Sequence, residues 1–298
     1  MIDQLGVSAM YPVEHADGED ASSPIRGDPI LAPPALHTGK PTARHAARLR
    51  HIPRSSDHCL NFVTVSPNGN PRDLTAVAQD YLKVIWTAQE WSHEKVSTKM
   101  LAERIGVSAS TASESIRKLA DQGLVDHEKY GAVTLTQAGR RAALEMVRRH
   151  RLMETFLVRM LGYSWDEVHD EAEVLEHAVS DRMLDRIDAK LGYPKRDPHG
   201  DPIPAADGHV PTPDARQLSV CSDGESGTVA RISDADPEML RYFDSVGITL
   251  DSRLMVLARR DFAGMISVAI KSANAREDDP GTTVDLGSPA AEAIWVVA

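Results

Sequence analysis

The stretch KVSTKMLAERIGVSASTASESIRKL, residues 95–119, decides the fold of the first half of the chain. Residues three and four positions apart share a face of an α-helix, and the apolar residues of a first helix follow this spacing: Val96, Leu101, Ala102 and Ile105. Gly106 allows a tight turn, and Ser108 is suited to cap a second helix. The apolar face of that second helix carries Ala112, Ile116 and Leu119. The pattern predicts a helix-turn-helix.

The flanking segments extend this motif. Downstream, LVDHEKYGAVTLT, residues 124–136, has β-branched residues around Tyr130 and Gly131 and predicts a two-stranded wing. Upstream, residues 73–91 predict a further helix with Asp73 as its N-cap. Its apolar residues at helical spacing are Val77, Tyr81, Val84, Ile85 and Ala88. A helix pair with no DNA role is the alternative, but a helix-turn-helix followed by a wing is typical of a DNA-binding module.

The second helix of the pair offers short hydrogen-bonding side chains to a major groove, where they can bond base edges and phosphates. The exposed residues are Ser108, Ser110, Thr111, Ser113, Glu114 and Lys118. Lys99, on the preceding helix, and Lys129, on the wing, are positioned to meet phosphate oxygens. Each of these two could equally be a solubilising surface lysine.

Two later stretches carry imidazoles and carboxylates at helical spacing. VRRHRLMETFL, residues 147–157, puts His150 and Glu154 on one face of a helix. VHDEAEVLEHAVSD, residues 168–181, gathers four more within about a third of a second helix's circumference: His169, Glu173, Glu176 and His177. Imidazole and carboxylate without thiol suit a borderline-to-hard divalent cation. A solvated acidic helix with incidental histidines is the alternative, although the interleaved apolar residues indicate that both helices also pack.

Composition sets limits on function. The chain has 298 residues, 42% of them hydrophobic and 26% charged, which is ordinary for a soluble protein of two or three small domains. Its net charge of -11 conceals an asymmetry. Residues 95–151 carry eleven Lys or Arg against six Asp or Glu, whereas residues 154–190 carry four against ten. One module is therefore suited to face phosphates and the next to hold cations.

Cysteine usage and hydropathy indicate a cytoplasmic protein. Cys59 and Cys221 are far apart and outside any CxxC spacing, so neither a disulfide framework nor a cysteine zinc site is expected. No apolar run approaches the length of a membrane span, and the N-terminus does not resemble a secretion signal. We expect no membrane partner.

The two ends of the chain differ. Residues 1–72 are rich in proline and lack periodicity, so we expect a disordered extension. Its basic cluster could touch DNA as an arm or be a solvated tail: Arg44, His45, Arg48, Arg50, His51 and Arg54. Residues 194–217 predict an extended proline-rich linker. Residues 218–298 predict a small β-barrel of short strands, LSVC, GTVARI, SRLMVLAR, MISVAI, TVDLG and AIWVV, with one helix, DPEMLRYFDSVG.

The chain resembles the diphtheria-toxin-repressor family of metal-activated transcriptional repressors in four segments and in their order. They are DYLKVIW, the helix-turn-helix and wing, RRHRLMETFL and VHDEAEVLEHAVSD. The resemblance covers residues 73–298. It implies a mainly α fold with a small β part: a winged helix-turn-helix (73–143), a helical dimerisation and metal-binding domain (144–193) and, after the linker, an SH3-like, FeoA-like domain (218–298). It also implies a homodimer.

The resemblance further implies metal ligands, residue by residue. Asp80, Glu173, Glu176 and His177 match the primary site of the family, and His150, Glu154 and His169 match the ancillary one. In the barrel, Asp234 is the candidate oxygen ligand and Asp236 the alternative, which could instead cap a helix. Asp80 and Glu173 stand where iron-responsive members have methionine and cysteine, as in manganese-responsive members.

Hard carboxylate oxygens in place of sulfur suit Mn(II), the weakest binder of its row. Lys83 is a departure, because the short manganese-type members have a carboxylate there, so two separated sites are expected rather than a closely bridged pair.

We therefore expect a non-catalytic, homodimeric, Mn(II)-activated repressor that binds a double-stranded DNA operator and controls manganese homeostasis genes. An Fe(II)-dependent repressor of the same family is the first alternative. A metallohydrolase is the second, but the chain lacks a motif such as HExxH, and hydrolysis would leave the helix-turn-helix unexplained.

Overall fold

The computed structural model of the protein describes residues 74–92, 95–127, 131–271 and 281–298, all of which fall in one contact unit, Cys59–Ala298. The predicted N-terminal extension, its basic cluster, Cys59, Asp73 and Lys129 lie outside these ranges. Among the described residues, no helix is both long and apolar enough to cross a membrane.

The first module contains helices α1 (Ala76–Glu90), α2 (Thr98–Ile105) and α3 (Ala109–Asp121), then strands β1 (Val125–His127) and β2 (Val133–Leu135). The helix-turn-helix forms as predicted. Ser108 caps α3 by accepting a hydrogen bond from the Thr111 backbone N–H (3.1 Å), and Gly106 takes the left-handed conformation with φ 74°. The predicted helix starts need correction, because Thr75 rather than Asp73 caps α1, and Ser97 caps α2 after Val96.

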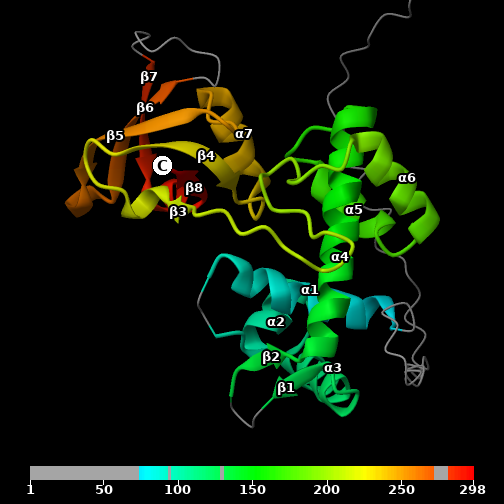
Figure 1. Ribbon diagram of the computed structural model, residues 1–298. Helices are drawn as coiled ribbons and strands as arrows, with labels where there is room; N and C mark the ends of the chain where they lie inside the picture. Colours follow the sequence, from blue (N-terminus) through cyan, green and yellow to red (C-terminus); the bar gives the residue numbers. More distant parts are fainter. Residues whose placement is uncertain (1–73, 93–94, 128–130, 272–280) are drawn as a thin grey trace, which may run out of the picture. The chain divides into compact units, whose positions relative to one another are not determined.

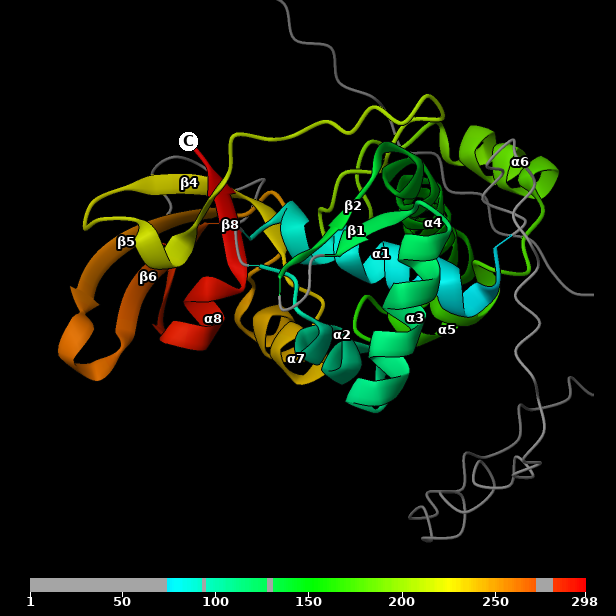
Figure 2. The ribbon, with the colours of Figure 1, turned by 90° about the horizontal axis from the view of Figure 1, so that it is seen from below.

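The hydrophobic core of this module forms between its three helices and the wing. Tyr81, Leu82 and Ile85 of α1 are fully buried, as is Ile116 of α3. Figure 2 shows α3 beside the antiparallel pair β1 and β2, which it contacts through β1. Val77, predicted on the apolar face of α1, is instead 45% exposed, so the buried stripe starts at Ala78.

Helix α4 (Gln137–Phe156) continues from the wing without a break across residues 143 and 144, where we expected a domain boundary (Figure 1). Its cap residue Thr136 also donates from Oγ1 to the Gly123 carbonyl oxygen (2.7 Å). Gly139 passes so close to the wing that a Cβ atom there would lie 1.9 Å from the Leu124 carbonyl oxygen. These contacts fix the start of α4 against the wing.

A π-helix (Leu157–Leu161) extends α4. Helices α5 (Val168–Leu175) and α6 (Asp181–Leu191) pack against α4. The predicted second ligand helix is shorter than expected, because α5 ends at Leu175. Glu176 keeps helical backbone angles (φ -58°, ψ -32°) as its C-cap, and His177 lies in the following turn.

The C-terminal module is a six-stranded antiparallel sheet with strand order β3-β8-β4-β5-β6-β7. Its elements are β3 (Arg216–Gln217), β4 (Ser226–Ile232), α7 (Pro237–Val246), β5 (Arg253–Arg260), β6 (Met265–Lys271), β7 (Thr282–Gly287), α8 (Ser288–Glu292) and β8 (Ile294–Val297). The predicted first strand, LSVC, is wrong at Leu218–Val220, which form a 3-10 helix after the short β3. The core includes Phe243 of α7 and Ile294 of β8.

The segment predicted as an extended linker is partly packed. Asp197, His199 and Asp201 are all at least 95% buried, and residues 196 and 202 form an isolated β-bridge. The sequence contains no signal of this burial, because Asp197 and Asp201 are compensated by Arg151, Trp91 and Arg231, which are distant in sequence. This segment therefore lies within the folded part of the chain rather than only connecting two domains.

A buried arginine on α4 joins the modules. Arg151 donates to both carboxylate oxygens of Glu90 at the end of α1 (3.0 and 2.5 Å) and to the carbonyl oxygen of Pro202 (2.6 Å). Asp201 accepts hydrogen bonds from Trp91 Nε1 and from Arg231 Nε of β4, both at 2.6 Å. The Arg231 guanidinium also lies over the rings of Trp91 and Trp295.

We predict that Arg151→Met lowers the free energy of unfolding by about 3–5 kcal/mol, because it leaves the carboxylates of Glu90 and Asp201 buried without this cation. Chemical denaturation of the metal-free protein measures the change. As a control, Arg196→Met removes the ion pair of Arg196 with Asp251, whose side chains are 40% and 50% exposed, and should cost less than about 1 kcal/mol. Equal losses in the two variants would contradict this role of Arg151.

Candidate metal centre

Asp80, Glu176 and His177 form the first of three groups of ligand atoms that lie close enough to share a cation. Asp80 is on α1, whereas Glu176 and His177 follow α5. His177 Nε2 is 2.9 Å from Asp80 Oδ1 and 3.5 Å from Glu176 Oε1. On its other side, Nδ1 of His177 is 2.8 Å from the Gln79 amide oxygen, which can only accept, so Nδ1 donates. Nε2 is therefore the ring nitrogen that faces the Asp80 and Glu176 oxygens, where a cation would meet all three side chains.

The second group contains His150, His169 and Glu173. His150 lies on α4, where its Nδ1 is 2.6 Å from Glu176 Oε2 and its Nε2 is 3.0 Å from Glu154 Oε1. His169 Nε2 is 3.6 Å from Glu173 Oε1. The contact of His150 with Glu176 joins this group to the first one.

The third group contains Glu154, His199 and Asp234. His199 Nε2 is 4.0 Å from Glu154 Oε1, and the His199 ring stacks on Trp165. Asp234 Oδ2 is 3.5 Å from His169 Nδ1, which links this group to the second. Asp236, the alternative barrel ligand, instead caps α7 by accepting from the backbone N–H groups of Glu238 and Met239.

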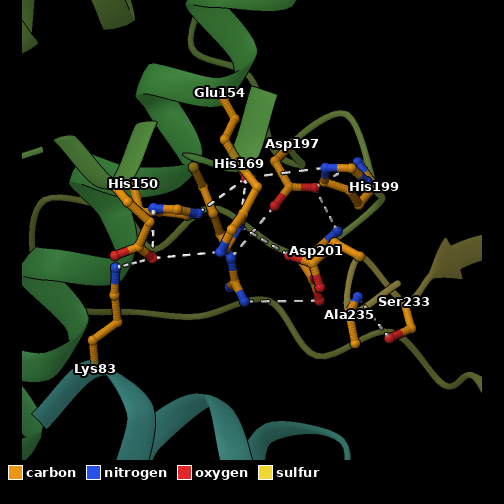
Figure 3. A network of polar contacts seen from close by, with 12 residues as sticks. Lys83, His150, Glu154, His169, Asp197, His199, Asp201, Ser233 and Ala235 are labelled. Carbon is orange, nitrogen blue, oxygen red and sulfur yellow. Dashed lines mark hydrogen bonds and ion pairs between the residues drawn. The ribbon is translucent and has the colours of Figure 1, made fainter. Parts of the chain in front are cut away.

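The three groups overlap the predicted primary and ancillary sites. Glu173 also lies near His150 and His169, and Glu154 also lies near His199, which was not among the predicted ligands. The segment HGDPIP contains that histidine, His199, but nothing in its local spacing distinguishes a ligand from a linker residue. Figure 3 shows His199 and Asp197 facing Glu154 from the packed linker.

Buried charge dominates the electrostatics of the centre. Burial alone lowers the pKa of His150, but the carboxylates of Glu154 and Glu176 outweigh it and raise that pKa to about 10. Burial alone would raise the pKa of Glu154, yet His150 holds it well below its usual range. Burial raises the pKa of Asp80 against the opposing effect of His177. A divalent cation at these groups would take the place of protons as the compensating charge.

Buried polar atoms without hydrogen-bond partners also indicate that these residues fit a divalent cation. Several buried ligand atoms have no hydrogen-bond partner among the described residues: Asp80 Oδ1, His169 Nδ1 and both ring nitrogens of His199. A buried polar atom without a partner is costly, and metal coordination satisfies it. The available donors are carboxylate oxygens and imidazole nitrogens, which suit Mn(II), Fe(II) or Zn(II).

The predicted DNA contacts lie on the exposed side of the winged helix. Ser108, Ser110, Thr111 and Ser113 are exposed, whereas Lys118 is partly covered and 3.5 Å from Glu114. Ser108 is occupied as the helix cap, and its Oγ is 2.8 Å from Ser110 Oγ and from Thr111 Oγ1. Lys99 is exposed near Glu103. Arg117, which is not among the predicted contacts, is an exposed cation on α3 that forms hydrogen bonds with Glu114.

Three family models match the chain in succession. The iron-dependent repressor N-terminal DNA-binding domain matches residues 73–133, the iron-dependent repressor metal-binding and dimerisation domain matches residues 136–205, and the FeoA domain matches residues 216–298.

Among curated proteins, the iron-dependent repressor IdeR of Mycobacterium leprae is 33% identical over 132 residues, which are 44% of this chain and 57% of that protein. The match therefore spans little more than half of that relative. The diphtheria toxin repressor of Corynebacterium jeikeium is 30% identical over 170 residues, 56% of this chain and 70% of that protein.

Solved structures give longer matches. A manganese-dependent transcriptional repressor in complex with manganese is 80% identical, covers 74% of this chain and 99% of its own, and superposes with a TM-score of 0.70. The manganese regulator SloR is 34% identical, covers 74% of this chain and 97% of its own, and has a TM-score of 0.61.

We predict that His199→Phe, which keeps an aromatic ring on Trp165, raises the dissociation constant of one Mn²⁺ ion per chain at least about tenfold. Equilibrium dialysis with metal analysis measures the occupancy. His209→Phe, at an exposed linker histidine, is the matched control and should bind as the parent does. If both variants bind Mn²⁺ like the parent, His199 is not a ligand.

Proposed function

The chain belongs to the iron-dependent repressor family, which includes the diphtheria toxin repressor, and on that premise we propose that it is a Mn(II)-activated transcriptional repressor of metal homeostasis genes. In this proposal the metal is the co-repressor, and no reaction is catalysed. The proteins that the chain matches are transcriptional repressors rather than enzymes, which argues against the metallohydrolase alternative.

The observation that carries the proposal is the origin of the ligands in the first group. Asp80 belongs to the DNA-binding module, whereas Glu176 and His177 belong to the helical module. A cation held by all three would hold these modules in one arrangement, because breaking the arrangement would cost a metal-ligand bond. When bound, the ion supplies a double positive charge and coordination positions for the carboxylate oxygens of Asp80 and Glu176 and the imidazole nitrogen of His177.

A fixed arrangement matters for DNA binding only if two copies of the winged helix act together. A dimer places two recognition helices at a defined spacing, and both enter major grooves one turn apart only if each is held against its own dimer half. The helical module exposes several large apolar side chains that a dimer partner would cover: Met160, Leu161, Val174, Met183 and Tyr193. We infer a homodimer that binds a double-stranded operator and acts in the cytoplasm, where the chromosome is.

The ligand chemistry favours manganese over iron. All ligand atoms in the three groups are oxygens or imidazole nitrogens. Without a soft sulfur donor, the site binds Fe(II) with less of an affinity advantage over Mn(II). Mn(II) is then selected by its preferred coordination number and by its availability in the cell. The 80% identical structure that contains manganese supports the same choice, and an Fe(II)-dependent repressor remains the alternative.

We predict that Mn²⁺ tightens binding to DNA from the promoter of the chain's own gene by at least about a hundredfold relative to chelator, a coupling within the usual allosteric range. Fluorescence anisotropy titrations with Mn²⁺, with anaerobic Fe²⁺ and with chelator measure the effect. Glu176→Gln should lose the activation, and Glu171→Gln, at an exposed acid of α5, should keep it. Equal affinity in Mn²⁺ and in chelator would refute the proposal, and stronger activation by Fe²⁺ would select the alternative.

Recognition is expected to depend on α3. Replacing Ser110 and Thr111 together by Ala removes groups suited to base edges, so discrimination between operator and random DNA should fall by about 1–3 kcal/mol per lost base contact. Lys99→Ala should instead weaken binding to all sequences and lower its salt dependence. Competition titrations at several salt concentrations separate these effects. Unchanged discrimination in the double variant would mean that α3 does not read bases through these residues.

A further inference from the structure

Arg117 lies on the face of α3 that the winged helix presents outward. Ser110, Glu114 and Arg117 are all exposed, and the spacings of four and three residues between them place them in one stripe along the helix. The opposite face of α3 is buried in the hydrophobic core of the module. A DNA groove that admits Ser110 therefore faces the Arg117 side chain as well.

Glu114 holds the Arg117 guanidinium by one of its edges. Nε of Arg117 is 3.1 Å from Glu114 Oε2, and Nη2 is 2.8 and 2.9 Å from Oε1 and Oε2. These N–H groups donate to the carboxylate as a two-pronged fork. The hydrogen bonds from Arg117 lower the pKa of Glu114, which keeps this carboxyl ionised and able only to accept.

The edge of the guanidinium that joins Nη1 and Nη2 is left for a ligand. Among the described residues, the only contact of Nη1 is an ion pair with Asp121 Oδ2 at 3.5 Å. The side chains of Arg117 and Asp121 are 63% and 67% exposed. Water screens such a pair, so it contributes little and can be exchanged for a stronger contact.

The same hydrogen bonds direct the guanidinium toward the N-terminal half of α3. Glu114 precedes Arg117 by three residues, and side chains on a helix already lean toward its N-terminus. In a helix-turn-helix, the N-terminal part of the second helix meets the base edges. Arg117 is therefore held toward the part of α3 that carries Ser110.

We propose that Arg117 reads a guanine in each half of the operator, with Glu114 as the positioning residue that presents the Nη1–Nη2 edge. Guanine matches this edge because it shows two neighbouring acceptors, O6 and N7, in the major groove. Adenine shows one acceptor and one donor there, and each pyrimidine shows at most one acceptor. The inference rests on the proposed function, which it deepens by naming a base and the residue that reads it.

A phosphate contact is the competing role for an exposed arginine, and the charges of α3 argue against it. Helix α3 carries two acids, Glu114 and Asp121, and two bases, Arg117 and Lys118. The charges of the helix therefore cancel, and Glu114 is also 3.5 Å from Lys118 Nζ. Acids on both sides of Arg117 repel phosphates, whereas a guanidinium edge that is held in place can still bond a base edge.

The experiment uses the full chain with Mn²⁺ and a DNA fragment from the promoter of its own gene. Each G·C pair in the footprinted half-sites is replaced in turn by A·T, symmetrically in both halves, and binding is measured by fluorescence anisotropy. In the parent, replacement of one such pair should weaken binding at least about tenfold. In Arg117→Ala, the same replacement should change binding by less than about twofold, because the residue that discriminates is gone.

Two further variants separate the roles of the pair. Glu114→Ala should lower the cost of replacing that same base pair to an intermediate value, because the guanidinium is no longer held. It should also tighten binding to random DNA, because a negative charge near the phosphates is removed. Arg186→Ala, at an exposed arginine of α6, is the matched control and should keep the base profile of the parent.

The proposal is overturned if Arg117→Ala weakens binding to every fragment equally, as loss of a phosphate contact would produce, or if it leaves the base profile unchanged. Loss of discrimination at a different base pair in Glu114→Ala would mean that Glu114 reads a base itself, and would contradict its positioning role. Equal binding of the parent in Mn²⁺ and in chelator would contradict the proposed function, while the base profile would still test Arg117.

Discussion

The arrangement of this protein depends on the cost of burying carboxylates. Glu154 and Glu176 are 1% and 0% exposed, and an unpaired carboxylate at such a position would cost several kcal/mol. The chain surrounds them with cations from distant parts of the sequence: His150 of α4 reaches both, and Lys83 of α1 reaches Glu176. Each of these pairs fixes one segment against another. The packing of helices and linker around the centre is therefore set by charge compensation as well as by the apolar cores.

The same constraint connects regions that have separate hydrophobic cores. The winged helix, the helical module and the sheet module each bury their own apolar cluster. The described contacts between them include hydrogen bonds and ion pairs made by Arg151, Asp201 and Arg231. Polar contacts of this kind have defined geometry and can be exchanged for others when a cation binds, which apolar packing does not allow. Separate cores joined in part by polar contacts are compatible with the metal-dependent arrangement of the modules that we propose.

Local sequence patterns were sufficient for the parts of the fold that local forces determine. The helix-turn-helix followed from apolar spacing, from Gly106 and from the cap at Ser108, and all three appear in the structure. His150 and Glu154 share a helix face because four residues separate them. The burial of His199, the packed linker and the end of α5 at Leu175 could not be predicted in this way. Each depends on partners that are tens of residues away, and periodicity within one segment contains no information about them.

The unbroken course of α4 has a mechanical consequence. Its first turn is fixed to the wing through Thr136 and Gly139, and its last turns hold His150 and Glu154. A helix of 20 residues is about 30 Å long and stiff over that length, so a tilt of about 10° at one end moves the other end by about 5 Å. A change in the tilt of α4 at the metal centre would therefore be transmitted along the whole helix to the wing.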